Sequence, residues 1–137
     1  MSYTSVDWED FPSTNTPMNA ANLNKMEKGI KDLYPTDWTN ATLSSYITGI
    51  VKYTQIGNMV IVIFDDMQIS SNISHGVVLA SGLPASKQYQ KVVLNNFDAP
   101  GTLVRLAINT SGQIVDHYTT VSSSSNTYYG TLIYLTD

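Results

Sequence analysis

The side chains best suited to bind a ligand lie on either side of a serine-rich run, residues 122–125. Acidic, imidazole and phenol groups precede this run, and two adjacent tyrosines follow it. A tyrosine offers a flat apolar face and a hydroxyl at low entropic cost, while carboxylates and imidazoles hydrogen-bond to hydroxyls. This combination suits a neutral polar ligand such as a sugar ring. The predicted saccharide-binding residues are Trp38, Asp116, His117, Tyr118, Tyr128 and Tyr129.

Each part of this prediction has a structural alternative. Tyrosines at strand positions are commonly half-buried sheet residues that contact no ligand. Trp38 follows a predicted helix, and we favour for it the simpler role of a cap over one end of the β domain.

Groups that could catalyse a reaction are few. The two histidines, His75 and His117, lack the spacing of a metal site, and the chain contains no cysteine. The adjacent carboxylates Asp65 and Asp66 stand where a strand is expected to end. Strand neighbours point to opposite faces, so these two do not form the facing pair that glycoside hydrolysis uses. We therefore expect a non-enzymatic protein with no cofactor and no metal.

Charge is scarce and unevenly distributed. Charged residues make up 13% of the 137 residues, and half of them occur at or before Asp37, whereas about 25% is typical of soluble domains. A net charge of -4 without a Lys/Arg cluster argues against a nucleic-acid partner. No apolar run is long enough for membrane insertion, and a 42% hydrophobic content argues against disorder.

The first 18 residues are predicted to form an extended arm. Pro12 and Pro17 bracket a polar run, and proline disfavours helical conformation both at its own position and at the preceding one. Trp8 and Phe11 are two apolar anchors that so short an arm cannot bury by itself. We expect them to attach the chain to another protein; docking onto the chain's own domain is the alternative.

A helix is predicted from Asn19 to Leu33, with Asn19 as its N-cap. Its apolar residues recur at spacings of 3, 4 and 3, which produces one narrow apolar seam. A helix of this length is only marginally stable alone in water, so something must cover the seam. We favour self-association as a short parallel bundle over packing on the chain's own sheet. The seam residues are Leu23, Met26, Ile30 and Leu33.

The remainder of the chain has the pattern of short β-strands separated by turns. Gly57-Asn58 predicts a type II′ hairpin, and Asp65-Asp66 is expected to end the strand that follows it. These features indicate a mainly β protein with an N-terminal arm and helix, residues 1–35, before an antiparallel β-sandwich or barrel head, residues 36–137. Strands are expected over residues 50–56, 59–64, 73–79, 91–94, 103–108, 113–118 and 128–135.

Two parts of the chain resemble proteins of one class. Residues 7–30 read DWEDFPSTNTPMNAANLNKMEKGI and resemble a stretch that recurs before a helix in tail-tip and baseplate proteins of phages infecting Gram-positive bacteria. Several hairpin segments resemble the C-terminal heads of phage tail-fibre and receptor-binding proteins. These segments are residues 51–60, 82–84, 104–108, 112–114 and 128–134.

The resemblance implies a homotrimeric adhesin located in the virion, at the phage tail tip or baseplate. Its arm would attach to other tail or baseplate proteins, its helix would trimerise, and its head would bind a saccharide of the host cell wall or surface. The alternative within the same class is a structural tail or baseplate component whose β head packs on other virion proteins.

Overall fold

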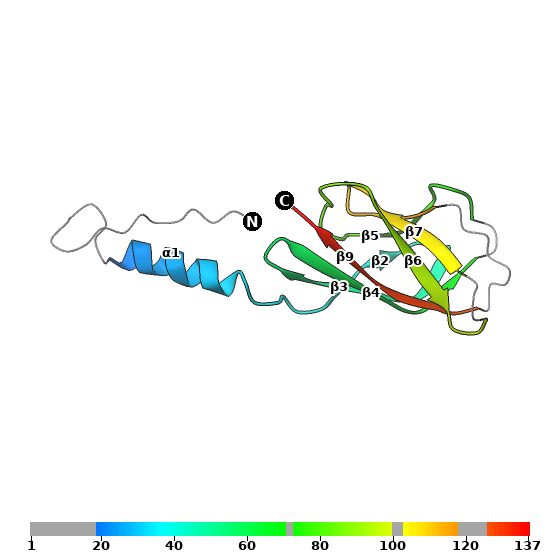
Figure 1. Cartoon of the computed structure of the whole chain (residues 1–137), viewed down its shortest axis with the longest axis horizontal. Coiled ribbons are helices and arrows are strands. Elements are labelled where there is room, and N and C mark those ends of the chain that lie inside the picture. The colour runs from blue at the N-terminus through cyan, green and yellow to red at the C-terminus, as the bar shows by residue number, and fades with distance from the viewer. Residues whose placement is uncertain (1–18, 71–72, 100–102, 118–125) are drawn as a thin grey trace.

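The computed structural model describes residues 19–70, 73–99, 103–117 and 126–137. In Figure 1 a single helix extends from one end of an all-β head. The predicted arm, with Trp8 and Phe11, lies outside the described residues, and so does Tyr118.

Helix α1 spans Ala20–Lys31, within two residues of the predicted bounds. The predicted N-cap is confirmed, because the side-chain oxygen of Asn19 accepts a hydrogen bond from the backbone N–H of Asn22 at 2.9 Å. None of the helix residues is buried. The four seam residues are 38–65% exposed, so no other described residue of the chain covers the seam. Helix α1 has 12 residues, and the described part of the chain contains no helix with the length and hydrophobicity needed to cross a membrane.

All strand pairs in the head are antiparallel, and the described strands form one sheet in the order β1-β3-β4-β9-β6-β7-β8-β5-β2. This confirms the predicted fold class of one helix followed by an antiparallel β head. The strands are β1 Thr39–Asn40, β2 Thr42–Leu43, β3 Ile47–Ile56, β4 Met59–Ile69, β5 Val78–Ser81, β6 Gln90–Asn96, β7 Leu103–Ile108, β8 Ile114–Asp116 and β9 Tyr128–Leu135.

One short segment brings the two ends of this sheet together into a nearly closed barrel. Thr39 and Asn40 pair with β3 at one end of the strand order, and Thr42 pairs with Ser81 of β5 at the other. Between them, the backbone N–H of Ala41 donates to the carbonyl of Val51 at 2.8 Å. The segment therefore covers two edges that would otherwise be exposed to unwanted pairing.

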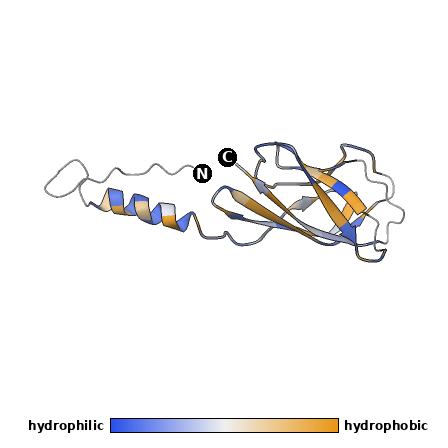
Figure 2. Cartoon of the chain, in the orientation of Figure 1, coloured by the Kyte–Doolittle hydropathy of each residue, from blue (hydrophilic) through white to orange (hydrophobic). Residues whose placement is uncertain are grey.

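The apolar core fills the barrel interior. Figure 2 shows the hydrophobic colouring concentrated along the central strands. Two tyrosines belong to this core, Tyr128 at 0% exposure and Tyr134 at 2%. The predicted hairpin between β3 and β4 is confirmed: Gly57 has a φ of +58°, and Asn58 is not at positive φ, as a type II′ turn requires.

Strand β4 differs from its prediction at the two aspartates. It continues through Asp65 and Asp66 to Ile69 instead of ending there. Between the pairs Phe64–Gly130 and Met67–Tyr128 the register shifts, so the two aspartates lie opposite the single residue Tyr129. This is a β-bulge, and Asp66 adopts the left-handed conformation with φ +47° that the bulge needs. The prediction that the two aspartates end the strand is wrong, because the bulge accommodates both residues and the strand continues beyond them.

Two other predicted strands are shorter in the structure. The run 73–79 becomes a strand only from Val78, with Ser74, His75 and Gly76 exposed before it. Of the described part of the run 113–118, which ends at His117, Ile114–Asp116 form a strand. In contrast, the predicted bounds of β7 and β9 agree with the structure.

Candidate functional site

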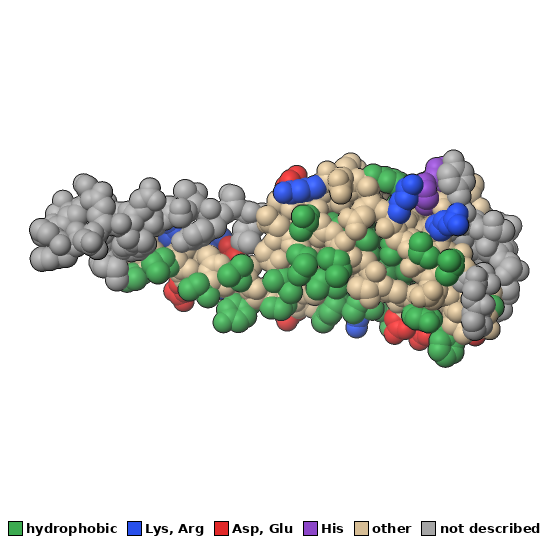
Figure 3. All heavy atoms as spheres, in the orientation of Figure 1, with side chains coloured by type: hydrophobic (Ala, Val, Ile, Leu, Met, Phe, Trp, Pro, Cys, Tyr) green, Lys and Arg blue, Asp and Glu red, His purple; other side chains and the backbone are tan. Residues whose placement is uncertain are grey.

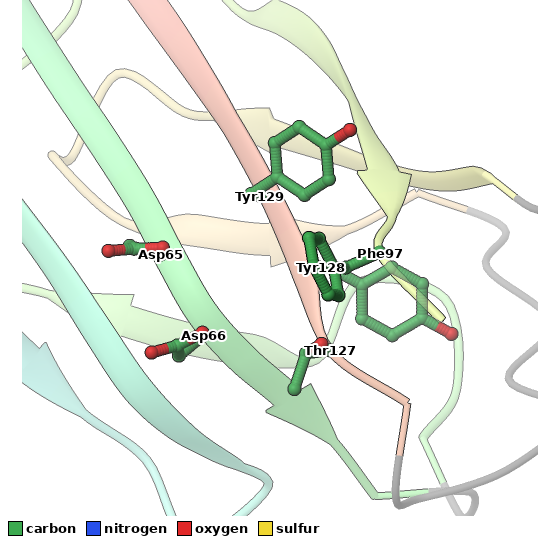
Figure 4. A pocket seen from close by; sticks show the side chains of 6 residues that line it. All are labelled: Asp65, Asp66, Phe97, Thr127, Tyr128 and Tyr129. Carbon is green, nitrogen blue, oxygen red and sulfur yellow. The ribbon is translucent and has the colours of Figure 1, made fainter. Parts of the chain in front are cut away.

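A pocket of about 430 Å³ is lined by residues at the end of β6 and the start of β9, and Figure 1 shows both strand ends on the side of the head away from α1. It forms where β4, β6 and β9 run side by side, and Figure 4 shows its side chains. We call it the distal pocket. Its lining residues are Asp65, Asp66, Phe97, Thr127, Tyr128 and Tyr129.

Two exposed aromatic rings form one side of the distal pocket. Phe97, just beyond the end of β6, is 75% exposed, and Tyr129 of β9 is 44% exposed. Their ring centroids lie 6.3 Å apart with an interplanar angle of 72°, an edge-to-face arrangement. Exposing two neighbouring apolar rings to water is unfavourable. Such an arrangement is typical of a binding surface.

The β4 bulge places two carboxylates on the same pocket. In a regular strand Asp65 and Asp66 would point to opposite faces, as the sequence led us to expect. Here both are exposed, both line the distal pocket, and Figure 4 shows them projecting from β4 to the same side. Carboxylates accept hydrogen bonds from hydroxyl groups. The pocket therefore combines apolar rings with strong acceptors.

A carboxylate in the adjacent loop fixes the start of β9. Asp98 Oδ2 accepts hydrogen bonds from the backbone N–H of Thr127 at 2.7 Å and from its hydroxyl at 2.9 Å. These two bonds, the backbone one first, lower the pKa of Asp98 below its ordinary value. The loop holding Asp98 is itself fixed, because Asn96 Oδ1 accepts from the backbone N–H groups of Asp98 and Ala99. These hydrogen bonds thus hold in place the backbone that carries Phe97 and the backbone that leads to Tyr129.

Tyr128 supports the pocket from inside the barrel. Its side chain is fully buried, and among the described residues its hydroxyl has no hydrogen-bond partner. The same holds for the side-chain N–H₂ group of Asn96, its cross-strand partner. Of the two adjacent tyrosines predicted to bind a ligand, Tyr129 alone presents its side chain to solvent.

The other half of the predicted cluster lies elsewhere on the head. Asp116 is 1% exposed in β8, and β6 and β7 separate β8 from β9 in the sheet. Three strand spacings of about 4.8 Å therefore stand between the two groups. His117 belongs to a different set of rings, with its centroid 5.3 Å from that of His75 and its Nδ1 3.4 Å from the hydroxyl of Tyr89.

Trp38 is also separate from the distal pocket. It is 48% exposed in the linker before β1, and the Nζ of Lys52 on β3 lies 5.4 Å from its ring centroid. This is a cation–π contact on the outside of the barrel. The structure therefore divides the six predicted residues, with Tyr128 and Tyr129 at the pocket and the others away from it or outside the described residues.

Sequence reasoning missed three of the pocket's exposed side chains. Asp65 and Asp66 were interpreted as a strand end, because a bulge leaves no distinct sequence signal beyond two polar residues inside an apolar run. Phe97 follows a strand whose last residues are Asn95 and Asn96, and a lone aromatic in a turn carries no periodic pattern. Among the described residues, no group of three or more histidines and carboxylates could hold a metal ion.

Comparison with known proteins finds similarity to the structure of this chain but not to its sequence. No model of a protein family matches, and no curated protein matches. Among the solved structures, the chain is similar to the receptor binding protein (gp15) of Listeria phage PSA, with a TM-score of 0.50 and 18% sequence identity. The match covers 90% of this chain and 83% of that chain. At the level of fold, the resemblance that the sequence indicated is confirmed.

Proposed function

We propose that this protein is a phage receptor-binding protein located at the tail tip or baseplate of the virion. The observation that carries the proposal is the structural similarity to a receptor binding protein over 90% of the chain. The resemblance of residues 7–30 to tail attachment segments supports it independently, because that stretch precedes the head. Trp8 and Phe11 then attach the chain to another tail or baseplate protein.

The ligand of the distal pocket is a saccharide of the host cell surface. A sugar ring has apolar C–H faces that stack on aromatic rings, and Phe97 and Tyr129 offer such rings at 75% and 44% exposure. Its hydroxyls donate hydrogen bonds, which the carboxylates of Asp65 and Asp66 are placed to accept. In this proposal the pocket binds its ligand and catalyses no reaction, and the two exposed carboxylates serve as hydrogen-bond acceptors.

The working form is a homotrimer joined through α1. All four seam residues are exposed in the single chain, and a 12-residue helix gains little stability by itself. Parallel association of copies covers every seam at once. It also directs all heads the same way, so the distal pockets face the host surface together and bind with avidity.

A structural role in the tail is the second candidate function. It is favoured by an apolar patch on the outside of the barrel, where Met59 pairs with Leu135 and Ile61 pairs with Ile133. Ile133 and Leu135 are 52% and 56% exposed. Such a patch suits contact with another virion protein or another copy of the head.

Binding to bacteria distinguishes the two functions. The full chain, fluorescently labelled, is mixed with a panel of Gram-positive species, and bound protein is measured on washed cells. A receptor-binding protein labels at least one species, and purified wall polysaccharide from that species competes the signal away. A trimer that labels no species and binds no wall polysaccharide would favour the structural role.

A further inference from the structure

A second group of ligand-binding side chains lies on the outer surface of β6, β7 and β8. It consists of Lys91, Arg105 and His117, which we call the basic cluster, and it lines a pocket of about 330 Å³ with Val92 and Val93. This volume falls within the range of about 300–1,000 Å³ typical of small-molecule sites. In Figure 3, Lys or Arg side chains lie next to a histidine toward the distal end of the head.

Sheet register brings the basic cluster together from three strands. Val93 pairs directly with Arg105, and Lys91 lies two residues before Val93 on the same face. The backbone N–H of His117 donates to the carbonyl of Arg105 at 2.9 Å, which continues the row to the residue directly after β8. Val93 is 51% exposed, so the three basic groups surround an apolar surface.

The charge of this region is opposite in sign to that of the whole protein. The chain carries -4, and residues 36–137 contain four Lys or Arg side chains, two of which converge here. The other two lie elsewhere, Lys52 over Trp38 and Lys87 beside the carboxylate of Asp137. Clustering half of the head's permanent cations around one pocket creates a local positive potential that attracts anions.

The titration of His117 supports this picture. Its pKa is lowered by partial burial first, and then by the charges of Lys91, His75 and Arg105, while Asp116 opposes them. Lys91 and Arg105 are two permanent cations beside the imidazole, and the buried Asp116 is the carboxylate that opposes them. The formal charges of Lys91, Arg105 and Asp116 sum to +1.

We propose that the basic cluster binds a single oxyanion, the carboxylate or phosphate of an anionic sugar, with Val93 as the apolar floor beneath the ring. Arg105 supplies a planar guanidinium that binds two oxygens of a carboxylate or phosphate, and Lys91 adds a point charge. That the anion is carried by a host surface polymer rests on the proposed receptor-binding function. The affinity for the anion itself does not.

Nuclear magnetic resonance titration of the isotopically labelled full chain tests the proposal. The probes are glucose, glucuronate and glucose 6-phosphate, which share a ring and differ in charge. Glucuronate or glucose 6-phosphate is expected to shift the amides of Val93, Arg105 and His117 and to raise the pKa of His117, whereas glucose does neither. The two anions compared directly show whether the site prefers carboxylate or phosphate.

Charge-removing variants locate the effect. Lys91→Gln and Arg105→Gln are each expected to weaken anion binding about tenfold or more, because each variant loses a cation that makes charge-assisted hydrogen bonds to the anion. Lys87→Gln removes a cation outside the pocket and should leave the affinity unchanged. Anion-induced shifts that are equal in Lys91→Gln and the parent protein, or equal shifts with glucose, would overturn the site.

Failure of this site is distinguishable from failure of the receptor-binding function. If the anions cause no shifts at the basic cluster while the parent chain still labels bacterial cells, the oxyanion site is wrong and the receptor-binding function stands. If the chain labels no bacteria while the anions still shift Val93 and His117, the site stands and the receptor-binding function fails.

Discussion

Gly49 of β3 packs against the backbone of Asp66 in β4 so closely that no side chain fits between them. A Cβ atom at position 49 would lie 2.8 Å from the Cα of Met67 and closer still to the carbonyl of Asp66. Gly49 also has a φ of +107°, a conformation that other residues rarely adopt. This contact accommodates the β4 bulge, whose two aspartates both line the distal pocket.

Replacing this glycine should therefore destabilise the head. We expect Gly49→Ala to lower the free energy of unfolding by about 3 kcal/mol, from backbone strain together with overlap. Gly76→Ala is the matched control, because Gly76 has a φ of +84° but open space around the new Cβ. It should cost only about 1–2 kcal/mol, the strain term alone. Urea denaturation measures both, and equal losses would show that the close contact with Asp66 is not required.

The two core tyrosines, Tyr128 and Tyr134, should respond differently to loss of the hydroxyl group. Tyr134 donates a 2.7 Å hydrogen bond to the carbonyl of Pro84, so Tyr134→Phe should cost about 1 kcal/mol. Tyr128 has no such partner among the described residues, so Tyr128→Phe should be neutral or stabilising. Thermal or urea unfolding compares the pair. A loss in Tyr128→Phe as large as that in Tyr134→Phe would mean that the Tyr128 hydroxyl has a partner.

Assembly through α1 can be tested at one seam residue. Ile30 is 57% exposed in the single chain, and in a parallel bundle Ile30→Asp would bury three like charges. We expect this variant to be monomeric by multi-angle light scattering at micromolar concentration, where the parent is a trimer. Asn24→Asp adds the same charge outside the seam and should leave the trimer intact. A parent protein that is itself monomeric would contradict the assembly.

His117 should make the head less stable in mild acid. Its lowered pKa means that the folded state disfavours the protonated imidazole. Its contribution is therefore fully present above the unfolded value of about 6.5 and declines as the pH falls through the lower folded value. Replacing the histidine with glutamine should reduce the stability lost between pH 7 and pH 5. If the two proteins lose the same stability over that interval, His117 does not titrate as described.

The sequence predicted the architecture better than the site because the two depend on different signals. Alternating apolar residues gave the bounds of β7 and β9, and Asn19 marked the start of α1, since these patterns are local. The segment 39–43 was missed because its strand character comes from the edges of β3 and β5 that it joins. No local pattern records those distant partners.

The site was harder to predict because its residues converge only after folding. Tyr129 was predicted, but its partners come from the β4 bulge and from the turn after β6, which are distant in sequence. Asp116 and His117 are separated from Tyr129 because β6 and β7 lie between their strands. Proximity along the chain to the serine-rich run therefore did not mean proximity in space.

Saccharide binding by the distal pocket is tested most directly by measuring the affinity of the full chain for wall polysaccharide from a species that it labels. Phe97→Ala and Tyr129→Ala should each weaken binding about tenfold, since one aromatic contact contributes about 1 kcal/mol or more. Tyr34→Ala removes an aromatic side chain that is 68% exposed and lies outside the pocket, in the linker after α1, and this variant should bind like the parent. Unchanged affinity in both pocket variants, with the fold intact, would contradict the account.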